Sequence, residues 1–515
     1  MKLPLTLMHL AVVALAAACS GAPGAAPASG LNKVNHIIIV MMENHSFDNY
    51  FGALAYAPGT PYHAAAGSCS EQDHGCIDGL DCRMDSAGSL TCTNSSPEDD
   101  GTRVVAFHAL SRCVAPDLAH SWLQTHLEAN FNDPNATLFS SPNDGFVRVN
   151  DATDQPDGGL ETPTEDQTMG FYTQDDLPLY YDLAQKFAID DRYFSSVLGP
   201  TLPNRFYLVA ATSFGHLATA DAVPAGGYKP ITGTIFDLLD NRQVSWADYF
   251  QDAPQAGAFR QTGGAGTDPH FFPVQDFLTA AAGSSGAGAL PQVVLIDPGF
   301  FGPDENDEHP PTDIQRGQAF VSRVINAVRY GPYWKDSVIF IAYDEHGGFY
   351  DHVAPPLAPQ GSARTPDGIS PGQCADLSNP PASRQPGGGA NCSSVADAQS
   401  LCSALAQDPS GPYPENCASF DQLGFRVPFL VVSPFAKPHY VSHAIADHTS
   451  LLAFIEERFL SDAESGTGSG SRLHLTLRDQ YAYALMDLFD FDNAPSLNTL
   501  ATQAELPAMD CTPAS

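Results

Sequence analysis

Short apolar runs alternate with amphipathic stretches along much of the chain. Four of the runs are long enough for strands buried on both faces, and they cover residues 36–42, 292–297, 337–343 and 427–433. Apolar residues recur with helical spacing at 175–187, 319–331 and 448–460. Strands that alternate with helices predict an α/β fold, with a mostly parallel central sheet and helices on both of its faces.

Two stretches interrupt this pattern, at about residues 60–105 and 355–420. Both are rich in Cys, Gly, Pro, Ser and Asp and show little periodicity. Because a strand and helix pattern resumes after each, we interpret them as disulfide-rich insertions into one domain of residues 34–495. Residues 496–515 are then predicted to be a C-terminal tail.

The N-terminus predicts export. Lys2 precedes a mostly apolar stretch that ends at Ala18 and is shorter than the ~20 residues of a membrane span, so residues 1–18 are predicted to be a signal peptide. Its Leu-Ala-Ala-Ala-Cys ending resembles a bacterial lipoprotein signal, which predicts lipidation of Cys19 and a tether at 19–33. Cleavage by an ordinary signal peptidase, which would release a secreted or periplasmic protein, is the alternative.

Composition supports an oxidising compartment and excludes one class of partner. The chain has 11 cysteines, and setting Cys19 aside leaves an even number suited to disulfides. Its 59 acidic and 23 basic residues give a net charge of −36. A polyanion needs Lys and Arg to displace its counterions, so we expect no nucleic-acid partner.

Polar side chains gather where the predicted strands end. Glu43 and Asn44 follow the first strand, Asp344 and Glu345 follow the strand at 337–343, and the residues 307–309 follow the strand at 292–297 after a loop. The carboxyl ends of parallel strands meet at one edge of a sheet, where ligands bind. Carboxylates gathered there repel one another unless a cation is present, and their oxygens suit a divalent metal ion. The alternative is that each acid only caps the next helix.

Thr201 is a candidate nucleophile. It follows Gly199 and Pro200 and stands just ahead of a helix that we predict to begin near Asn204. Backbone amides and the helix dipole favour a phosphate at such a position. The alternative is that Thr201 is a turn or cap residue.

Several motifs resemble a known family. They are MMENHSFDNYFG (41–52), PDLAHSW (116–122), DRYFSSVLGPTLPNR (191–205), DEHPP (307–311), YDEHGGFYDHVAPP (343–356), RVPFLVVSPFAKP (426–438) and DHTSLLAFIEERF (447–459). In these stretches the chain resembles the phosphoesterases that include bacterial and plant non-specific phospholipases C and an acid phosphatase. The resemblance implies an alkaline phosphatase-like fold.

The resemblance also implies a role for each matching residue. One divalent metal ion, of unspecified identity, would be held by Glu43, Asn44, Thr201, Asp344 and Glu345. Thr201 would be the nucleophile, and His120 and His309 would contact the phosphoryl group or protonate the leaving oxygen. Residues predicted to orient these groups or to contact substrate are His45, Asn204, Arg205, His346, His352 and His448. For Arg205 the alternative is a simple pair with a neighbouring carboxylate, and for the last three histidines a packing role.

These points predict an exported, metal-dependent phosphoesterase that works through a phosphothreonine intermediate. The family has Thr at the nucleophile position in phospholipases C and Ser in the acid phosphatase, so Thr201 favours a phospholipase C-like enzyme. The alternatives are a broad-specificity acid phosphatase acting on phosphomonoesters and a non-catalytic surface lipoprotein that serves as a binding module. The predicted partners are a phosphoester, with phospholipid as one candidate, and a membrane if Cys19 is lipidated.

Overall fold

The computed structural model describes residues 30–498, 504–509 and 511, with gaps at 87, 115–116, 131–140, 152–164, 215, 217, 220–222, 225, 231, 260–267, 287, 360–419, 421 and 462–471. The predicted signal peptide at 1–18, Cys19, most of the tether, most of the insertion at 355–420 and much of the C-terminal tail lie outside the described residues. The last four tether residues, Gly30–Lys33, form a 3-10 helix in which Leu31 is buried.

An eight-stranded sheet forms the centre of the protein, with the order β12-β11-β13-β1-β14-β15-β10-β16. Every pairing is parallel except the two made by β15, which runs antiparallel to β14 and to β10. The mostly parallel sheet predicted from sequence is therefore confirmed. The strands are β1 (His36–Met42), β10 (Ala188–Asp190), β11 (Trp246–Phe250), β12 (Phe271–Pro273), β13 (Val293–Asp297), β14 (Ser337–Tyr343), β15 (Phe429–Val432) and β16 (Tyr440–Ser442).

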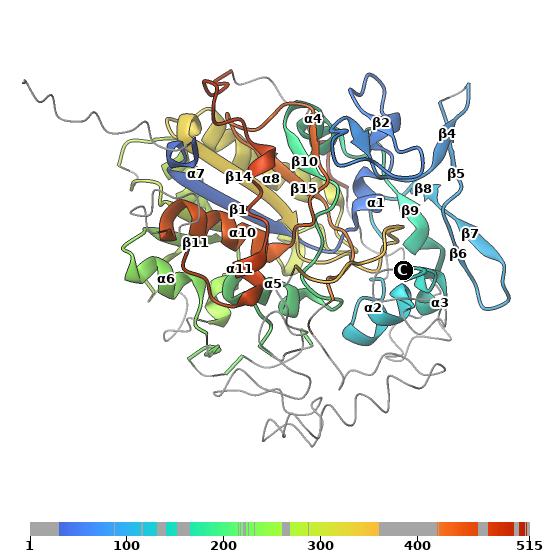
Figure 1. Ribbon diagram of the computed structural model, residues 1–515, viewed down its shortest axis with the longest axis horizontal. Helices are drawn as coiled ribbons and strands as arrows, with labels where there is room; N and C mark the ends of the chain where they lie inside the picture. The colour runs from blue at the N-terminus through green and yellow to red at the C-terminus, as the bar shows by residue number, and fades with distance from the viewer. Residues whose placement is uncertain are drawn as a thin grey trace, which may run out of the picture.

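The strand β1 lies in the middle of this sheet (Figure 1). All seven of its residues are buried, as are all seven of β14, which explains their unbroken apolar sequences. The pairing aligns Met42 with Tyr343, so β1 and β14 end side by side. The residues that follow the two strands are thereby brought together at one edge of the sheet.

Helices cover both faces of the sheet. The Phe340 ring on β14 packs 5.1 Å from Phe454 of α10, centroid to centroid. Tyr343 points to the opposite face, where its hydroxyl and that of Tyr180 on α4 donate to Glu308. One helical layer contains α4 (Pro178–Lys186), α7 (Val274–Ala281) and α8 (Ile314–Arg329), and the other contains α5 (Thr201–Ala210), α6 (Ile235–Asn241), α10 (His448–Ile455) and α11 (Leu477–Tyr481).

Two helix boundaries differ from the sequence prediction. The helix predicted at 319–331 begins earlier, at Ile314, because the Asp313 side chain accepts the N–H of Gln315 and caps it. The helix predicted to begin near Asn204 begins at Thr201. Pro203 suggested a later start, but a proline is tolerated in the first turn, where its missing N–H is not needed. A third helix, α10, ends at Ile455 and continues as a π-helical turn over Glu456–Leu460.

The insertion near residues 60–105 consists of short strand pairs beside the main sheet (Figure 1). Disulfides join Cys69 to Cys76 and Cys82 to Cys92 within it. A third disulfide joins Cys113 to Cys511. The strands of the insertion are β2 (His63–Ala64), β3 (Cys76–Ile77), β4 (Cys82–Met84), β5 (Leu90–Cys92), β6 (Ser95–Pro97) and β7 (Arg103–Val105). A further short pair, β8 (Phe107–His108) and β9 (Gly170–Phe171), follows it in the chain. The remaining predicted disulfide cysteines, at 374, 392, 402 and 417, lie outside the described residues.

Three short helices lie near the insertion, namely α1 (Phe47–Phe51), α2 (Trp122–Ala129) and α3 (Phe146–Asn150). Of all the helices that the structure describes, none has the length and apolar character that crossing a membrane requires.

Candidate active site

The ends of β1 and β14 meet as the sequence predicts. One oxygen of the Asp344 carboxylate accepts the backbone N–H of Asn44 at 3.2 Å and that of Glu345 at 2.7 Å. The N–H of Glu43 donates to the carbonyl of Asp307 at 2.9 Å, which brings in the loop that follows β13. Three segments far apart in sequence therefore converge at the carboxyl edge of the sheet.

Asn44 is held in a left-handed backbone conformation with φ of 63°. Asparagine tolerates this region better than most residues, and Gly347 makes room for the turn. A Cβ on Gly347 would lie 2.2 Å from the carbonyl oxygen of Asn44. Both polar atoms of the Asn44 side chain are buried without a hydrogen-bond partner among the described residues. A buried amide in this state has unused capacity to bind a ligand.

Arg205 links the carboxylates of the two strand ends. Its guanidinium donates to Asp344 at 2.9 Å and contacts Glu43 at 3.0 Å, and it stacks 4.9 Å from the centre of the Phe300 ring. Burial raises the pKa of Asp344 to about 7, although Arg205 opposes the rise. Arg205 thus pairs with neighbouring carboxylates, and because it also lines the pocket its predicted contact with substrate stays a prediction.

The residues present fit a divalent cation by their chemistry. Glu43, Asp344 and Glu345 offer carboxylate oxygens, and Asn44 offers an amide oxygen. Oε1 of Glu345, like the Asn44 amide, is buried without a hydrogen-bond partner in the described part of the chain. The three carboxylates are not packed around a point, however. They are not one of the described side-chain groups whose ligand atoms all lie within 4.8 Å of one another, and Arg205 bridges two of them.

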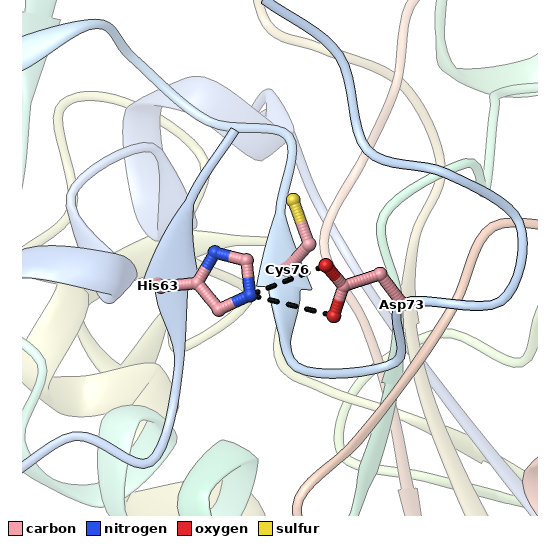
Figure 2. Close-up of side chains that lie close together, drawn as sticks. All are labelled: His63, Asp73 and Cys76. Carbon is pink, nitrogen blue, oxygen red and sulfur yellow. Dashed lines mark hydrogen bonds and ion pairs between the residues drawn. The ribbon is translucent and has the colours of Figure 1, made fainter. Parts of the chain in front are cut away.

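One group whose ligand atoms do lie that close together is found away from this edge, in the small sheet β2-β3. Figure 2 shows His63 beside Asp73, with Cys76 on the neighbouring strand. The sulfur of Cys76 is bonded to Cys69, so it offers no thiolate to a metal ion. We therefore do not assign a metal site there.

Thr201 is the first residue of α5 and faces a large pocket. The pocket has a volume of about 980 Å³, and Glu43, Arg205 and His309 line it together with Thr201. The Thr201 hydroxyl makes no hydrogen bond to another described residue. It therefore remains available to a substrate, at the N-terminus of a helix whose dipole favours an anion. The N–H of Leu202 already donates to Thr219 and that of Asn204 to the carbonyl of Pro200, so the amide left for a ligand in the described first turn is that of Thr201.

His120 and His309 approach each other across Asp117. Their ring centroids are 6.0 Å apart, and Asp117 carboxylate oxygens lie 3.9 Å from His120 Nδ1 and 3.7 Å from His309 Nε2. Oε1 of Glu345 lies 3.8 Å from His120 Nε2. Asp117 belongs to the PDLAHSW motif, but sequence reasoning gave it no role. The one signal for it in the sequence is that Asp117 shares this motif with His120.

These carboxylates keep both imidazoles protonated near neutral pH. Burial alone would lower the pKa of His120, but Glu345 and Asp117 outweigh it and raise the pKa to about 9. Burial would likewise lower the pKa of His309, but Asp117 and Glu43 raise it to about 9. A divalent cation among the same carboxylates would offset part of both rises.

Comparison with known proteins identifies the family of the chain. Residues 34–460 match the model of the Phosphoesterase family. The chain belongs to the Phosphoesterase family. The prediction of a hydrolase acting on phosphoester bonds is thereby confirmed.

Curated relatives of this phosphoesterase include plant and bacterial proteins. Non-specific phospholipase C6 of Arabidopsis thaliana is 26% identical over 492 residues, which cover 93% of this chain and 77% of the relative. Phospholipase C B of Mycobacterium tuberculosis is 30% identical over 470 residues, which cover 85% and 75%. Among solved structures, human ectonucleotide pyrophosphatase/phosphodiesterase 5 has a TM-score of 0.32 and 11% identity over 61% of this chain and 94% of that chain. At that similarity the superposition does not define the fold, which rests on the sheet described above.

The other predicted residues of this phosphoesterase lie beneath or beside the pocket. His346 bonds the buried Glu128 at 2.8 Å and contacts Glu345 at 3.2 Å, and His448 bonds the carbonyl of Asp344 at 2.8 Å. His45 lies between the Asn49 side chain and the carbonyl of Glu308. These histidines are positioned to orient the residues of the strand ends. Glu128 was not predicted, because nothing in its sequence neighbourhood marks it.

Asn204 has a local structural role. Its side chain accepts the N–H of Val197 at 3.0 Å and donates to the carbonyls of Gly199 and Pro200 at 2.8 and 3.2 Å. It thereby shapes the turn that presents Thr201. Glu308, from the DEHPP motif, points into the core instead of the pocket, where the hydroxyls of Tyr50, Tyr180 and Tyr343 all donate to it.

His352 belongs to a separate buried ion-pair network. Its imidazole contacts Asp48 at 2.7 Å and Asp78 at 3.3 Å. Arg426 is fully buried and bonds both Asp48, at 3.0 Å, and Asp351, at 2.9 Å. Because Asp78 lies in the disulfide-rich insertion and Arg426 just before β15, the network ties the insertion to the main sheet.

His352 predicts a pH-dependent stability. Burial would lower its pKa, but Asp48 and Asp78 raise it to about 10, well above the 6.5 of a free histidine. A raised pKa stabilises the folded state fully below about pH 6.5, and this contribution is lost as the pH rises through about 10. We predict that His352→Gln lowers the free energy of unfolding at pH 6 by on the order of a few kcal/mol. The difference from wild type should shrink towards pH 10.

Denaturant unfolding of wild type and variant between pH 6 and 10 measures this difference. The exposed His63, with its Asp73 partner in Figure 2, supplies the control variant His63→Gln, which should unfold like wild type throughout. A deficit for His352→Gln that is constant with pH would contradict the assigned charge state.

Proposed function

We propose that the protein is an exported, metal-dependent phosphoesterase of phospholipase C type. The observation that carries this proposal is the pocket in which Thr201, at the first position of α5, lies with Glu43, Arg205 and His309. The names of the curated relatives, phospholipases C of plants and of Mycobacterium tuberculosis, support it.

The residues that would hold the metal ion are Glu43, Asn44, Thr201, Asp344 and Glu345. A bound divalent ion supplies positive charge for phosphoryl oxygens and lowers the pKa of a hydroxyl beside it. Arg205 holds Glu43 and Asp344 in place from the other side, and His346 and His448 hold Glu345 and the backbone of Asp344.

In the first step, Thr201 reacts as the alkoxide, its hydroxyl proton having been released to solvent. Its Oγ1 attacks phosphorus in line with the leaving oxygen, and the phosphorus–oxygen bond to that group breaks. The N–H of Thr201, for which the described residues show no acceptor, donates to a phosphoryl oxygen at the start of α5. His120 or His309, protonated through Asp117 and Glu345, gives a proton to the departing alkoxide. A water molecule then attacks the phosphothreonine, the same histidine takes a proton from that water, and Thr201 is restored.

The lining of the pocket favours a substrate with a large organic group. Beyond Thr201 the wall is mainly apolar, and a cavity of about 980 Å³ is far larger than a phosphate ion needs. The apolar side chains are Leu202, Phe206, Val223, Phe271, Phe300 and Phe301. This wall favours a phosphodiester with an apolar substituent over a small phosphomonoester.

Export remains part of the proposal and includes lipidation of Cys19. The three disulfides of the described residues suit an oxidising compartment, where such bonds persist. Mass determination of the mature protein from membranes would give the mass of a diacylated Cys19 if the proposal is correct.

A substrate panel tests the activity directly. Purified protein is incubated with phosphatidylcholine, a chromogenic phosphodiester and a chromogenic phosphomonoester, each with and without EDTA. We expect metal-dependent release of diacylglycerol and faster turnover of the diester than of the monoester. Faster turnover of the monoester would favour the acid phosphatase alternative, and no turnover of any ester would overturn the proposal.

A further inference from the structure

We propose that the loop bearing Phe301 docks the protein onto an uncharged or zwitterionic lipid surface, so that the pocket opens directly against the lipid. The choice of a lipid occupant rests on the proposed phospholipase C-type function. The geometry of the loop is independent of that function.

Phe301 lies at the rim of the pocket. It contributes to the pocket lining, and yet 70% of its surface is exposed to solvent. Its neighbour Phe300 lines the same pocket and stacks on the buried Arg205. An apolar surface thus continues from the interior of the pocket to the outside of the molecule, which is the arrangement needed to draw a lipid from an aggregate without exposing its chains to water.

The loop holds Phe301 outward in a fixed position. One carboxylate oxygen of Asp252 accepts the N–H groups of both Phe300 and Phe301 at 2.9 Å. Gln251 donates to the carbonyl of Asp304 at 2.8 Å and accepts from Asn306 at 2.8 Å. A loop ordered in this way loses little conformational entropy when the ring enters another phase.

Other exposed apolar side chains are attached to the same end of α8. Pro303 of the loop accepts a hydrogen bond from Arg316 in the first turn of α8. The N–H groups of Leu506 and Met509 donate to Gln315 and Asp313. Leu110 lies two residues before Arg112, whose carbonyl accepts the N–H of Ile314. Leu110, Phe301, Leu506 and Met509 are 92%, 70%, 37% and 50% exposed, and we call these four residues the apolar rim, although of the four only Phe301 lines the pocket.

Charge selects the kind of surface. An anionic membrane is held by clusters of Lys and Arg, but residues 300–312 contain neither and include Asp304, Glu305 and Asp307. The two nearby arginines are already engaged, since Arg316 donates to the carbonyl of Pro303 and Arg112 pairs with Asp313 at 3.6 Å. The chain as a whole carries a net charge of −36. An anionic surface would therefore repel the protein, whereas a zwitterionic one, such as phosphatidylcholine, accepts the apolar rim without a charge penalty.

Vesicle sedimentation with the full-length protein tests this proposal without turnover. In a Thr201→Ala background we expect binding to phosphatidylcholine vesicles, and Phe301→Ser should lower the partition coefficient about tenfold or more, the value of burying one large apolar side chain. Tyr330→Ser is the matched control. Tyr330 is 62% exposed but follows the opposite end of α8, about 24 Å from its first turn. Its loss should leave binding unchanged.

Vesicles that also contain phosphatidylglycerol should bind less protein, most clearly at low salt. Equal binding by the Phe301→Ser and Tyr330→Ser variants, or no binding by any variant, would overturn the docking proposal. The two proposals fail separately. A protein that hydrolyses phosphoesters but binds vesicles without regard to Phe301 refutes only the docking surface. One that binds through Phe301 but hydrolyses no phosphoester refutes only the proposed enzyme.

Discussion

Replacing Thr201 by alanine should lower the turnover of a chromogenic phosphodiester by roughly a thousandfold or more, because the nucleophile is lost. Thr201→Ser should keep measurable activity, since a hydroxyl remains at the first position of α5. Initial rates at saturating substrate measure both variants. Enzyme that is mixed with labelled substrate, quenched with acid and digested should give a labelled phosphopeptide containing residue 201, both for wild type and for the Thr201→Ser variant.

The matched control is Thr91→Ala, in the exposed part of β5 within the insertion. This substitution removes the hydroxyl of a threonine that does not line the pocket, so the variant should turn over substrate at the wild-type rate. Turnover of Thr201→Ala within a few fold of wild type would show that another group attacks phosphorus. The pocket would then have to be assigned again around the Asp117, His120 and His309 cluster.

Removal of the metal ion should have the second largest effect. Dialysis against EDTA is expected to abolish turnover, and a divalent ion should restore it. Asn44→Ala should weaken the metal affinity by at least about tenfold, because it removes a ligand whose buried amide has no other partner in the described part of the chain. Elemental analysis of the purified proteins and activity at increasing metal concentration measure the affinity.

Asn493→Ala, an exposed asparagine near the C-terminal end of the fold, is the control and should bind metal as wild type does. Circular dichroism separates loss of the ion from loss of the fold. If the Asn44→Ala protein is folded and binds metal with wild-type affinity, the Asn44 amide is not a ligand. Turnover that survives complete chelation would contradict the metal requirement itself.

The sequence predicts the centre of the fold well because the central strands are buried on both faces. In β1 and β14 every residue after the first, His36 and Ser337, is apolar or aromatic, so their limits are visible without knowledge of their neighbours. The residues that follow them, Glu43, Asn44, Asp344 and Glu345, share one edge as a consequence of parallel pairing. Their convergence at one edge was therefore predictable once the two strands were expected to run in parallel.

The parts that escaped prediction depend on particular side-chain contacts, some local and some between distant segments. The start of α5 at Thr201 depends on Asn204 bonding back to Gly199 and Pro200. Asp117 lies between His120 and His309, although one of these is more than a hundred residues away. The pairing of Arg205 with both Glu43 and Asp344 depends on how the buried strand ends meet, which sequence spacing does not report.

The Cys113–Cys511 disulfide has a consequence for the timing of maturation. Cys113 precedes Asp117 and His120 by a few residues, and the partner cysteine is 398 residues away along the chain. This disulfide can join the segment that carries these two residues to the C-terminal region only after residue 511 has been synthesised and the two thiols have been oxidised. A reducing cytoplasm would leave this covalent link unmade, so we expect it to form only in an oxidising compartment.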